Sequence, residues 1–316
     1  MAIRRPNKPV EAGTDVFALD YGSASSTIPT WDSGFPVDLG ILDQQRWSQR
    51  LTGTNSMYTH LTNAEGSNTN FAWDSNVGWG LNYGSGSLSY MLRRAPGFFD
   101  VVAYTGNNST QLVSHNLEAT PELIIIKNRT SAAEWVIYES SIFAAQYSGT
   151  TTYTGYIIFS SGGSSFNPLD NVWPWNSTAP TSSTFSVGYS SNIGSDYQTN
   201  QSSKNYIAYL FASLDGISKV GSYTGTGSAI NVDCGFTAGA RFVLIKRTDS
   251  SGDWYVWDTT RGIVSGNDPY RVLNSSAAEV TNTDYIDPLN AGFTVTSSAP
   301  AALNTSGGTY LFFAIA

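Results

Sequence analysis

The chain has 316 residues, 41% of them hydrophobic and only 13% charged, and its formal net charge is −8. The hydrophobic fraction excludes a disordered chain, no apolar run of about 18 residues exists to cross a membrane, and Lys and Arg are not clustered as nucleic-acid binding requires. The abundant Ser, Thr, Asn, Gly and aromatic residues are typical of β-strands joined by turns and not of helices.

Residues 1–18 are predicted to form an extended N-terminal arm. Three cations, Arg4, Arg5 and Lys8, precede the first acidic residue. No apolar stretch follows them, so this segment does not have the pattern of a signal peptide. We expect the arm to be the docking segment of the protein.

The strongest signal in the sequence is an internal repeat. Residues 101–139 align without a gap with residues 220–258 at an offset of 119, and 11 of the 39 positions are identical, against roughly 2–3 expected by chance at average residue usage. The identities include a Tyr-Thr-Gly triplet and Trp135, which matches Trp254. Both tryptophans are therefore expected in the core. A duplicated module explains the pattern.

A third copy is indicated before the first of these two. Residues 90–92 (Tyr-Met-Leu) match residues 209–211 (Tyr-Leu-Phe) at the same offset, as the closing line of a copy. The predicted organisation is the arm, a degenerate first β-module at 19–97, a second at 98–216 and a third at 217–316.

Each full copy contains a hairpin pattern. Leu123–Lys127 is a continuous apolar run that ends in lysine, as expected for a strand buried on both faces. A polar loop and an aromatic strand follow, and Phe242–Lys246 begins the same order in the next copy. Several short strands in each copy predict an all-β fold of tandem β-sandwich or jelly-roll-like modules.

The hairpins also place charges opposite each other. Lys127 precedes Glu134, and Lys246 precedes Asp253, by seven residues. We expect each lysine to form a surface ion pair across its hairpin, worth about 0–1 kcal/mol.

Neither a nucleophile nor a metal site is expected. His115 aligns with Cys234, the single cysteine, so one position carries two different donor atoms, whereas metal and nucleophilic chemistry depend on donor identity. A partly buried strand position explains the exchange better. A lone cysteine also rules out a disulfide within the chain.

Paired carboxylates, as in glycoside hydrolysis, are the remaining route to catalysis. Glu134 and Glu139 recur as Asp253 and Asp258. Because a catalytic carboxylate must be placed within about 0.5 Å, it does not readily exchange Glu for Asp. The acids are therefore interpreted as structural, and no catalytic residue, metal or cofactor is predicted.

A long loop offers one candidate binding surface. Residues 160–183 are rich in Gly, Pro and Ser and contain Trp173 and Trp175. Exposed indole rings at this point would suit a glycan or a protein partner. The alternative is that they pack in a core or a subunit interface.

Residues 93–106 (RRAPGFFDVVAYTG) resemble a segment of an uncharacterised repeat family found in virion proteins of tailed bacteriophages, often labelled tail-fibre-like or decoration proteins. A hairpin typical of this family is matched at 243–254 (VLIKRTDSSGDW), and a closing line at 307–316 (GGTYLFFAIA). The likeness extends over residues 90–316, and residues 138–170 depart from it.

The resemblance implies a location in the virion and supplies no catalytic residues. We therefore expect a non-enzymatic structural protein of a phage particle, in surface decoration, a fibre or a tail attachment, with the arm docked on capsid or tail proteins. A homo-oligomer, preferably a trimer, is expected because low charge and many aromatic residues suit subunit interfaces. A receptor that binds host-surface carbohydrate through Trp173 and Trp175 is the alternative, followed by a polysaccharide depolymerase.

Overall fold

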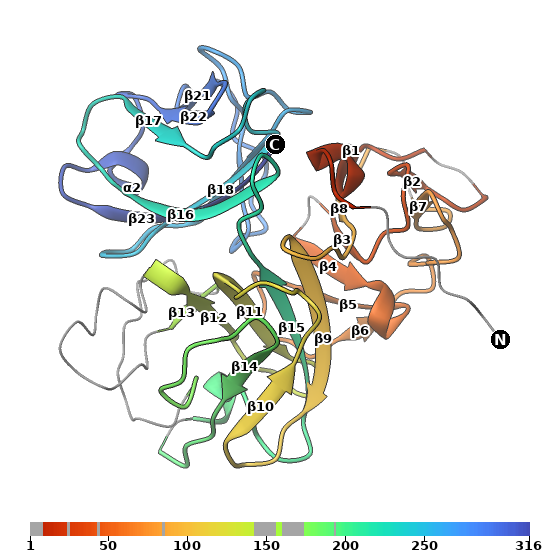
Figure 1. The fold of residues 1–316 in the computed structure, drawn as a ribbon. Coiled ribbons are helices and arrows are strands. Elements are labelled where there is room, and N and C mark those ends of the chain that lie inside the picture. Colours follow the sequence, from red (N-terminus) through yellow and green to blue (C-terminus); the bar gives the residue numbers. More distant parts are fainter. Residues whose placement is uncertain are drawn as a thin grey trace.

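The computed structural model describes residues 9–23, 26–42, 45–83, 86–141, 156–159, 174–192 and 194–316. Their regular structure is almost entirely β and forms three modules around a common centre (Figure 1). The helical elements are short: η1 (Gly13–Asp15), η2 (Arg50–Thr52), η3 (Ser195–Tyr197) and α2 (Ala301–Asn304). The all-β prediction is confirmed.

The strands divide among the modules in chain order. Module 1 contains β1 (Phe17–Asp20), β2 (Trp31–Asp32), β3 (Leu39–Leu42), β4 (Arg46–Gln49), β5 (Asn55–Tyr58), β6 (Gly66–Ser67), β7 (Gly78–Trp79) and β8 (Ser89–Leu92). Module 2 contains β9 (Phe99–Thr105), β10 (Gln111–Ser114), β11 (Leu123–Asn128), β12 (Trp135–Glu139), β13 (Ile157–Ile158), β14 (Thr184–Val187) and β15 (Asn205–Phe211). Module 3 contains β16 (Ser218–Thr224), β17 (Ile230–Asp233), β18 (Phe242–Arg247), β19 (Trp254–Asp258), β20 (Arg271–Val272), β21 (Ile286–Leu289), β22 (Gly292–Val295) and β23 (Thr309–Ile315).

The three modules share one topology. The large sheets run β1-β8-β3-β4-β5-β6, β9-β15-β11-β12-β13 and β16-β23-β18-β19-β20, so in each the first strand pairs with the last, and the last pairs with the hairpin. The small sheets, β2-β7, β10-β14 and β17-β22-β21, likewise come from equivalent parts of each copy. The degenerate first copy therefore has the same fold as the other two.

Equivalent residues pair across the strands of modules 2 and 3. Tyr104 lies opposite Tyr206 in module 2, and Tyr223 lies opposite Tyr310 in module 3. Both pairs stack, with ring centroids 5.1 Å and 4.9 Å apart. In modules 2 and 3, the tyrosine of the Tyr-Thr-Gly triplet thus fixes the first strand against the last.

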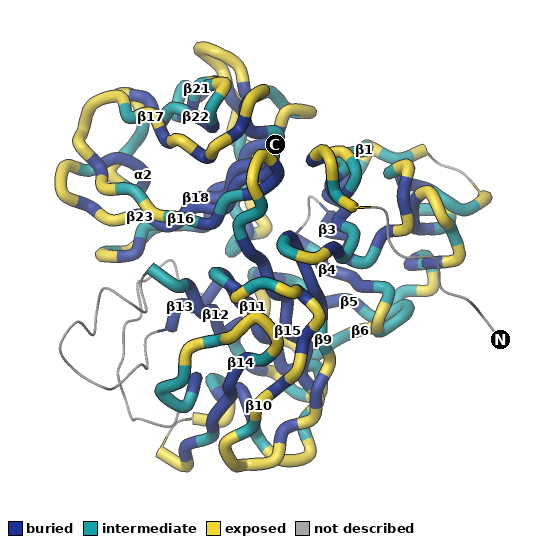
Figure 2. The backbone as a smooth tube through the Cα atoms, in the orientation of Figure 1, coloured by how far each residue is buried: buried dark blue, intermediate teal, exposed yellow. Residues whose placement is uncertain are grey.

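Each large sheet is buried on both faces. One face packs against the small sheet of its own module, as Phe312 does on Phe293 with 5.5 Å between ring centroids. The other face points to the centre of the molecule, as the neighbouring Phe313 does. Burial is therefore concentrated where the modules meet and exposure at the outer loops (Figure 2).

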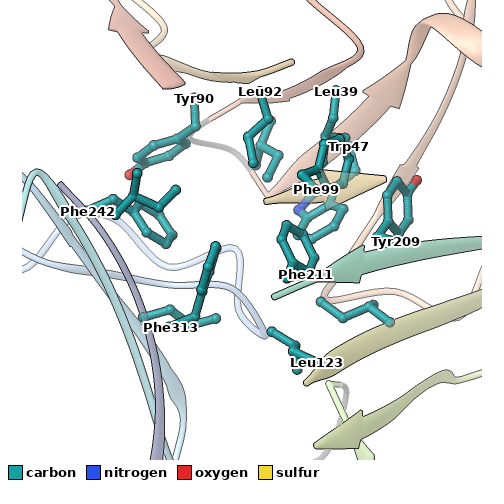
Figure 3. Packing of buried hydrophobic residues seen from close by; sticks show 14 of the residues in the cluster. Leu39, Trp47, Tyr90, Leu92, Phe99, Leu123, Tyr209, Phe211, Phe242 and Phe313 are labelled. Atoms are coloured by element: carbon teal, nitrogen blue, oxygen red, sulfur yellow. The ribbon is translucent and has the colours of Figure 1, made fainter. Parts of the chain in front are cut away.

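The inward faces form one common core (Figure 3). Phe313 of module 3 lies 4.9 Å from Phe211 of module 2, and Phe242 of module 3 lies 5.7 Å from Phe17 of module 1, measured between ring centroids. A cavity of about 30 Å³, lined by apolar side chains of all three modules, remains at the centre. The modules are thus fused by a shared hydrophobic core.

The predicted arm is too long. Val16 and Phe17 are fully buried in the common core, and β1 begins at Phe17. Gly13 packs so closely on the C-terminal residue that a Cβ atom would lie 2.0 Å from the Ala316 oxygen. Apolar side chains at the end of the segment, which outweigh its basic start, draw these residues into the fold. Arg4, Arg5 and Lys8 lie outside the described residues.

Candidate functional site

One of the two tryptophans of the loop, Trp175, is not exposed. Trp175 is only 1% exposed and packs in the internal core of module 2, with its ring edge-on to Tyr138 at 5.5 Å. The prediction for Trp175 is wrong, because loop composition shows where the backbone leaves a sheet and not where an indole finds apolar contacts. Trp173 lies outside the described residues. The carbohydrate interpretation therefore rests on Trp173 alone.

The aligned pair His115 and Cys234 occupies buried positions directly after β10 and β17, 6% and 5% exposed. The His115 ring accepts a hydrogen bond from the Leu117 N–H at 3.3 Å. Burial lowers the pKa of His115 and raises the pKa of the Cys234 thiol to about 12. Both side chains are thus neutral packing residues near neutral pH, as their exchange between copies predicts.

The two hairpin lysines are not at the surface. Lys127 and Lys246 are both fully buried. The Lys127 ammonium donates to the Thr62 carbonyl of module 1 at 2.7 Å and to the Ala133 carbonyl. Burial lowers the pKa of each lysine to about 8. The predicted surface position of the two lysines is wrong. At Lys127 the reason is that module 1 covers the end of the hairpin, so Lys127 ties two modules together.

The tryptophans after these lysines are core residues, as predicted, and they also join modules. Trp135 and Trp254 are fully buried. The Trp135 indole N–H donates to the Tyr58 carbonyl at 3.1 Å, and the Trp254 indole N–H donates to the Ile158 carbonyl at 3.3 Å. Tyr58 ends β5 and Ile158 ends β13, which are equivalent strands of modules 1 and 2. The same contact is thus made at two module boundaries.

One position at the end of the hairpin carries an amide or an acid in every module. Gln49, Glu139 and Asp258 lie opposite the first residues of β3, β11 and β18. Gln49 accepts from the Tyr209 hydroxyl of module 2 at 2.6 Å. Glu139 accepts from the Ser141 N–H at 2.9 Å. The position is thus used each time to hold local or neighbouring structure.

Asp258 is the centre of a buried lock between modules 1 and 3. It is fully buried and pairs with Arg261, whose side chain is 2% exposed. The Tyr90 hydroxyl of module 1 donates to Asp258 Oδ2 at 3.0 Å, and Arg261 Nε reaches Glu279 at 2.6 Å. Burial raises the pKa of Tyr90 well above its ordinary value, so the phenol stays protonated and can donate. Sequence reasoning identified Asp258 as structural but did not identify its partners.

A groove of about 410 Å³ lies where module 2 meets the open side of module 3. We call it the module 2–3 groove. Its floor is apolar, from Val220, Val232 and Phe312, each nearly fully buried. Its rim is polar, and a second hollow of about 400 Å³ continues from it past Asp215. The acidic residues along the two hollows are Glu122, Glu139, Asp215 and Asp233, against one cation, Lys219.

Two open sheet edges border this groove. Among the described strands, β16 pairs with β23 alone, and β17 pairs with β22 alone. On β16, Ser218 bonds Leu214 through its outward N–H and C=O, and Val220 bonds the Ser213 hydroxyl through its own, whereas no described residue bonds to the outward groups of Ser222.

The described part of the chain contains neither a metal-binding cluster nor a membrane-spanning helix. No group of three or more His, Cys, Asp or Glu side chains there is arranged to hold a metal ion. No helix among these residues is long and apolar enough to cross a membrane.

Comparison with known proteins identifies the family. A family model described as a domain of unknown function (DUF7483) matches residues 43–316, which include modules 2 and 3 entirely and module 1 from the residue after β3. No curated protein and no solved structure matches the chain. Since the matched residues make up most of its length, the chain belongs to the DUF7483 family.

Proposed function

We propose that the chain is a non-catalytic structural protein of a phage particle, in surface decoration, a fibre or a tail attachment, and that it works through protein–protein contacts. The phage setting is inferred from the resemblance of residues 93–106 and the hairpin at 243–254. The non-catalytic part of the proposal is supported by buried polar side chains that bind other groups of the protein.

The observation that carries this is the position shared by Gln49, Glu139 and Asp258. An amide, a long acid and a short acid stand there in turn, and each binds a protein group of its own or a neighbouring module. A general acid or base needs one functional group kept in place within reach of a substrate proton. The exchange of functional groups, with the fold maintained, fits a scaffold.

Quantitative mass spectrometry of purified particles of the encoding phage tests the proposal. We expect the protein in the particle, with a high copy number in head decoration and a low one at a tail or vertex. Expression during infection without incorporation into particles would refute it.

The docking role of the arm needs a narrower deletion than its predicted length. Removal of residues 1–18 would take Val16 and Phe17 out of the common core. Removal of residues 1–8 alone leaves every described residue in place. We expect this shorter variant to fold and to be lost from particles, and normal incorporation would contradict a docking role of Arg4, Arg5 and Lys8.

A further inference from the structure

We propose that the chain cleaves itself once, at the peptide bond between Asp268 and Pro269, through attack of the Asp268 carboxyl on its own backbone carbonyl carbon. The two residues lie between β19 and β20 in module 3. The inference goes beyond the proposed function and leaves it standing, because the reaction cuts each chain once and has no other molecule as its substrate. Its test uses purified protein, so its failure would leave the particle assignment untouched.

The Asp268 carboxyl is held in place and keeps one oxygen available. The side chain is fully buried, and Oδ2 accepts the N–H groups of Tyr285 and Ile286, both at 3.0 Å. Oδ1 is buried as well, and no described residue bonds to it. An asparagine in this place would accept the same two N–H groups through its amide oxygen. The two hydrogen bonds therefore do not require an acid here.

The carbonyl group under attack is polarised by a fixed donor. The Thr283 hydroxyl donates to the Asp268 carbonyl oxygen at 2.8 Å. This oxygen gains negative charge when the carbonyl carbon becomes tetrahedral, and a donor already in position stabilises that charge. The Asp268 N–H donates in turn to the Thr283 carbonyl at 2.7 Å, so the two residues hold each other in place.

The backbone is also fixed on the other side of the bond. Tyr270 and Val280 exchange two backbone hydrogen bonds of 3.0 Å each, and Pro269 is buried between the two pinned positions. The attacking oxygen and the carbonyl carbon belong to one residue, so their separation depends only on the two side-chain rotations of Asp268. The bonds to Oδ2 restrain these rotations, and fixed orientation of reacting groups accelerates a reaction.

Proline is a favourable leaving group. Its nitrogen is part of a tertiary amide, and the additional carbon substituent makes it a better proton acceptor as the bond breaks. In the first step Oδ1 bonds to the carbonyl carbon, the bond from this carbon to the Pro269 nitrogen breaks with its electron pair on nitrogen, and the carboxyl proton moves to that nitrogen. Water then opens the cyclic anhydride formed at Asp268, which becomes the C-terminus of the first fragment.

The carboxyl can supply this proton under mild conditions. Burial, together with the nearby acids Asp284 and Asp287, raises the pKa of Asp268 to about 6. At that pH an exposed aspartate is almost fully ionised, whereas half of the Asp268 side chains carry the proton. Because the protonated form reacts, cleavage should be fastest below pH 6 and should fade above it.

The cut leaves module 3 assembled. The second fragment, residues 269–316, contains β23, which pairs with β16 and β18 of the first fragment. It also carries Phe313 in the common core. The two fragments therefore stay together in the folded protein and separate only when it is denatured.

Intact-mass measurement of the purified chain, incubated at pH values on both sides of 6, tests the proposal. We expect fragments 1–268 and 269–316 under denaturing conditions, and one species in native size exclusion. The bond between Asp287 and Pro288 is an internal control, since it joins the same two residue types and lies in β21. It should stay intact in the folded chain, and in urea the two bonds should be cut equally slowly.

Four variants identify the reacting groups. Asp268→Asn keeps the fold but has no carboxyl, so it should stop the cleavage, and Pro269→Ala should slow it because an ordinary amide nitrogen leaves less readily. Thr283→Val removes the donor to the carbonyl and should slow cleavage at least about tenfold. Thr281→Val, which removes an exposed hydroxyl of the same loop, should be cut at the unaltered rate.

Circular dichroism and thermal melting check that each variant is folded. A folded chain that stays intact below pH 6 would overturn the proposal. Equal cleavage after Asp268 and Asp287 in the folded chain would overturn it too, because the dipeptide alone would then explain the reaction. So would unchanged cleavage in Asp268→Asn.

Discussion

The common core predicts that a single buried ring controls the stability of all three modules. Phe313→Ala removes a ring that is 4% exposed, packs on Phe211 of module 2 and lies beside the central cavity of about 30 Å³. Truncation of a core phenylalanine costs about 3–5 kcal/mol, and the cost increases by about 24 cal/mol for each Å³ of void that remains. Because the new void joins an existing one, we expect a loss near the upper limit, about 5 kcal/mol.

The neighbouring residue provides the control. Phe312 lies in the same strand, is 3% exposed and faces the internal core of module 3. Phe312→Ala removes the same ring, so it should cost a similar amount but act within one module.

Urea unfolding followed by tryptophan fluorescence measures the total loss, since the nine tryptophans of the chain are spread over all three modules. Hydrogen exchange with mass spectrometry shows which strands lose stability. With Phe313→Ala, protection should fall in β8 and β15 as well as in module 3, whereas with Phe312→Ala the loss should be concentrated in module 3. A loss below about 2 kcal/mol for Phe313→Ala, or a fall in protection confined to module 3, would refute the reasoning.

Three further predictions follow from the other contacts. Deletion of residues 1–8 should leave the urea midpoint unchanged, whereas deletion of residues 1–18, which removes Val16 and Phe17, should cost about 4 kcal/mol or more; equal midpoints would contradict this. Arg261→Met leaves Asp258 buried without its cation and should cost about 3–5 kcal/mol in the same assay, and a loss below about 1 kcal/mol would show that the pair does not lock the modules. Burial raises the pKa of the fully buried Asp268 to about 6, above its ordinary value, so its contribution to stability is complete below about pH 4 and is lost as pH rises through 6. Asp268→Asn should remove this slope and gain at most about 3 kcal/mol at pH 7, and melting curves whose pH dependence is the same in both proteins would disprove it.

Much of the fold could be predicted from the sequence because repeated residues and apolar runs mark the strands directly. The alignment of Trp135 with Trp254 revealed the duplication, and the run at Leu123–Lys127 correctly predicted a strand buried on both faces. The exchange of His115 for Cys234 correctly predicted a buried position. Each of these inferences depends on periodicity or equivalence, which the sequence states directly.

The errors concern side chains whose surroundings come from distant segments. Lys127 is buried because the chain near Thr62, 65 residues earlier, covers it. Trp175 is buried because its loop returns to the core of module 2. An apolar run shows that both faces of a strand are covered, but it does not say whether a subunit or another module covers the second face. The expectation of a trimer remains a prediction, while the apolar faces on which it was based are covered within one chain.

The equivalent contacts at the module boundaries have a consequence for how surfaces can diversify. An assembly of three identical subunits must repeat every surface feature three times, because a change to one is a change to all. Here the three units are separate stretches of one polypeptide, so a boundary can alter without its counterparts. Asp38, Glu122 and Arg241 each directly precede the first hairpin strand of their module, and Asp38 binds Arg94, Glu122 binds the Ser213 N–H, and Arg241 binds the Phe17 carbonyl. Because these three contacts differ, the three modules are not related by exact threefold symmetry, and each boundary can offer a different surface to a partner.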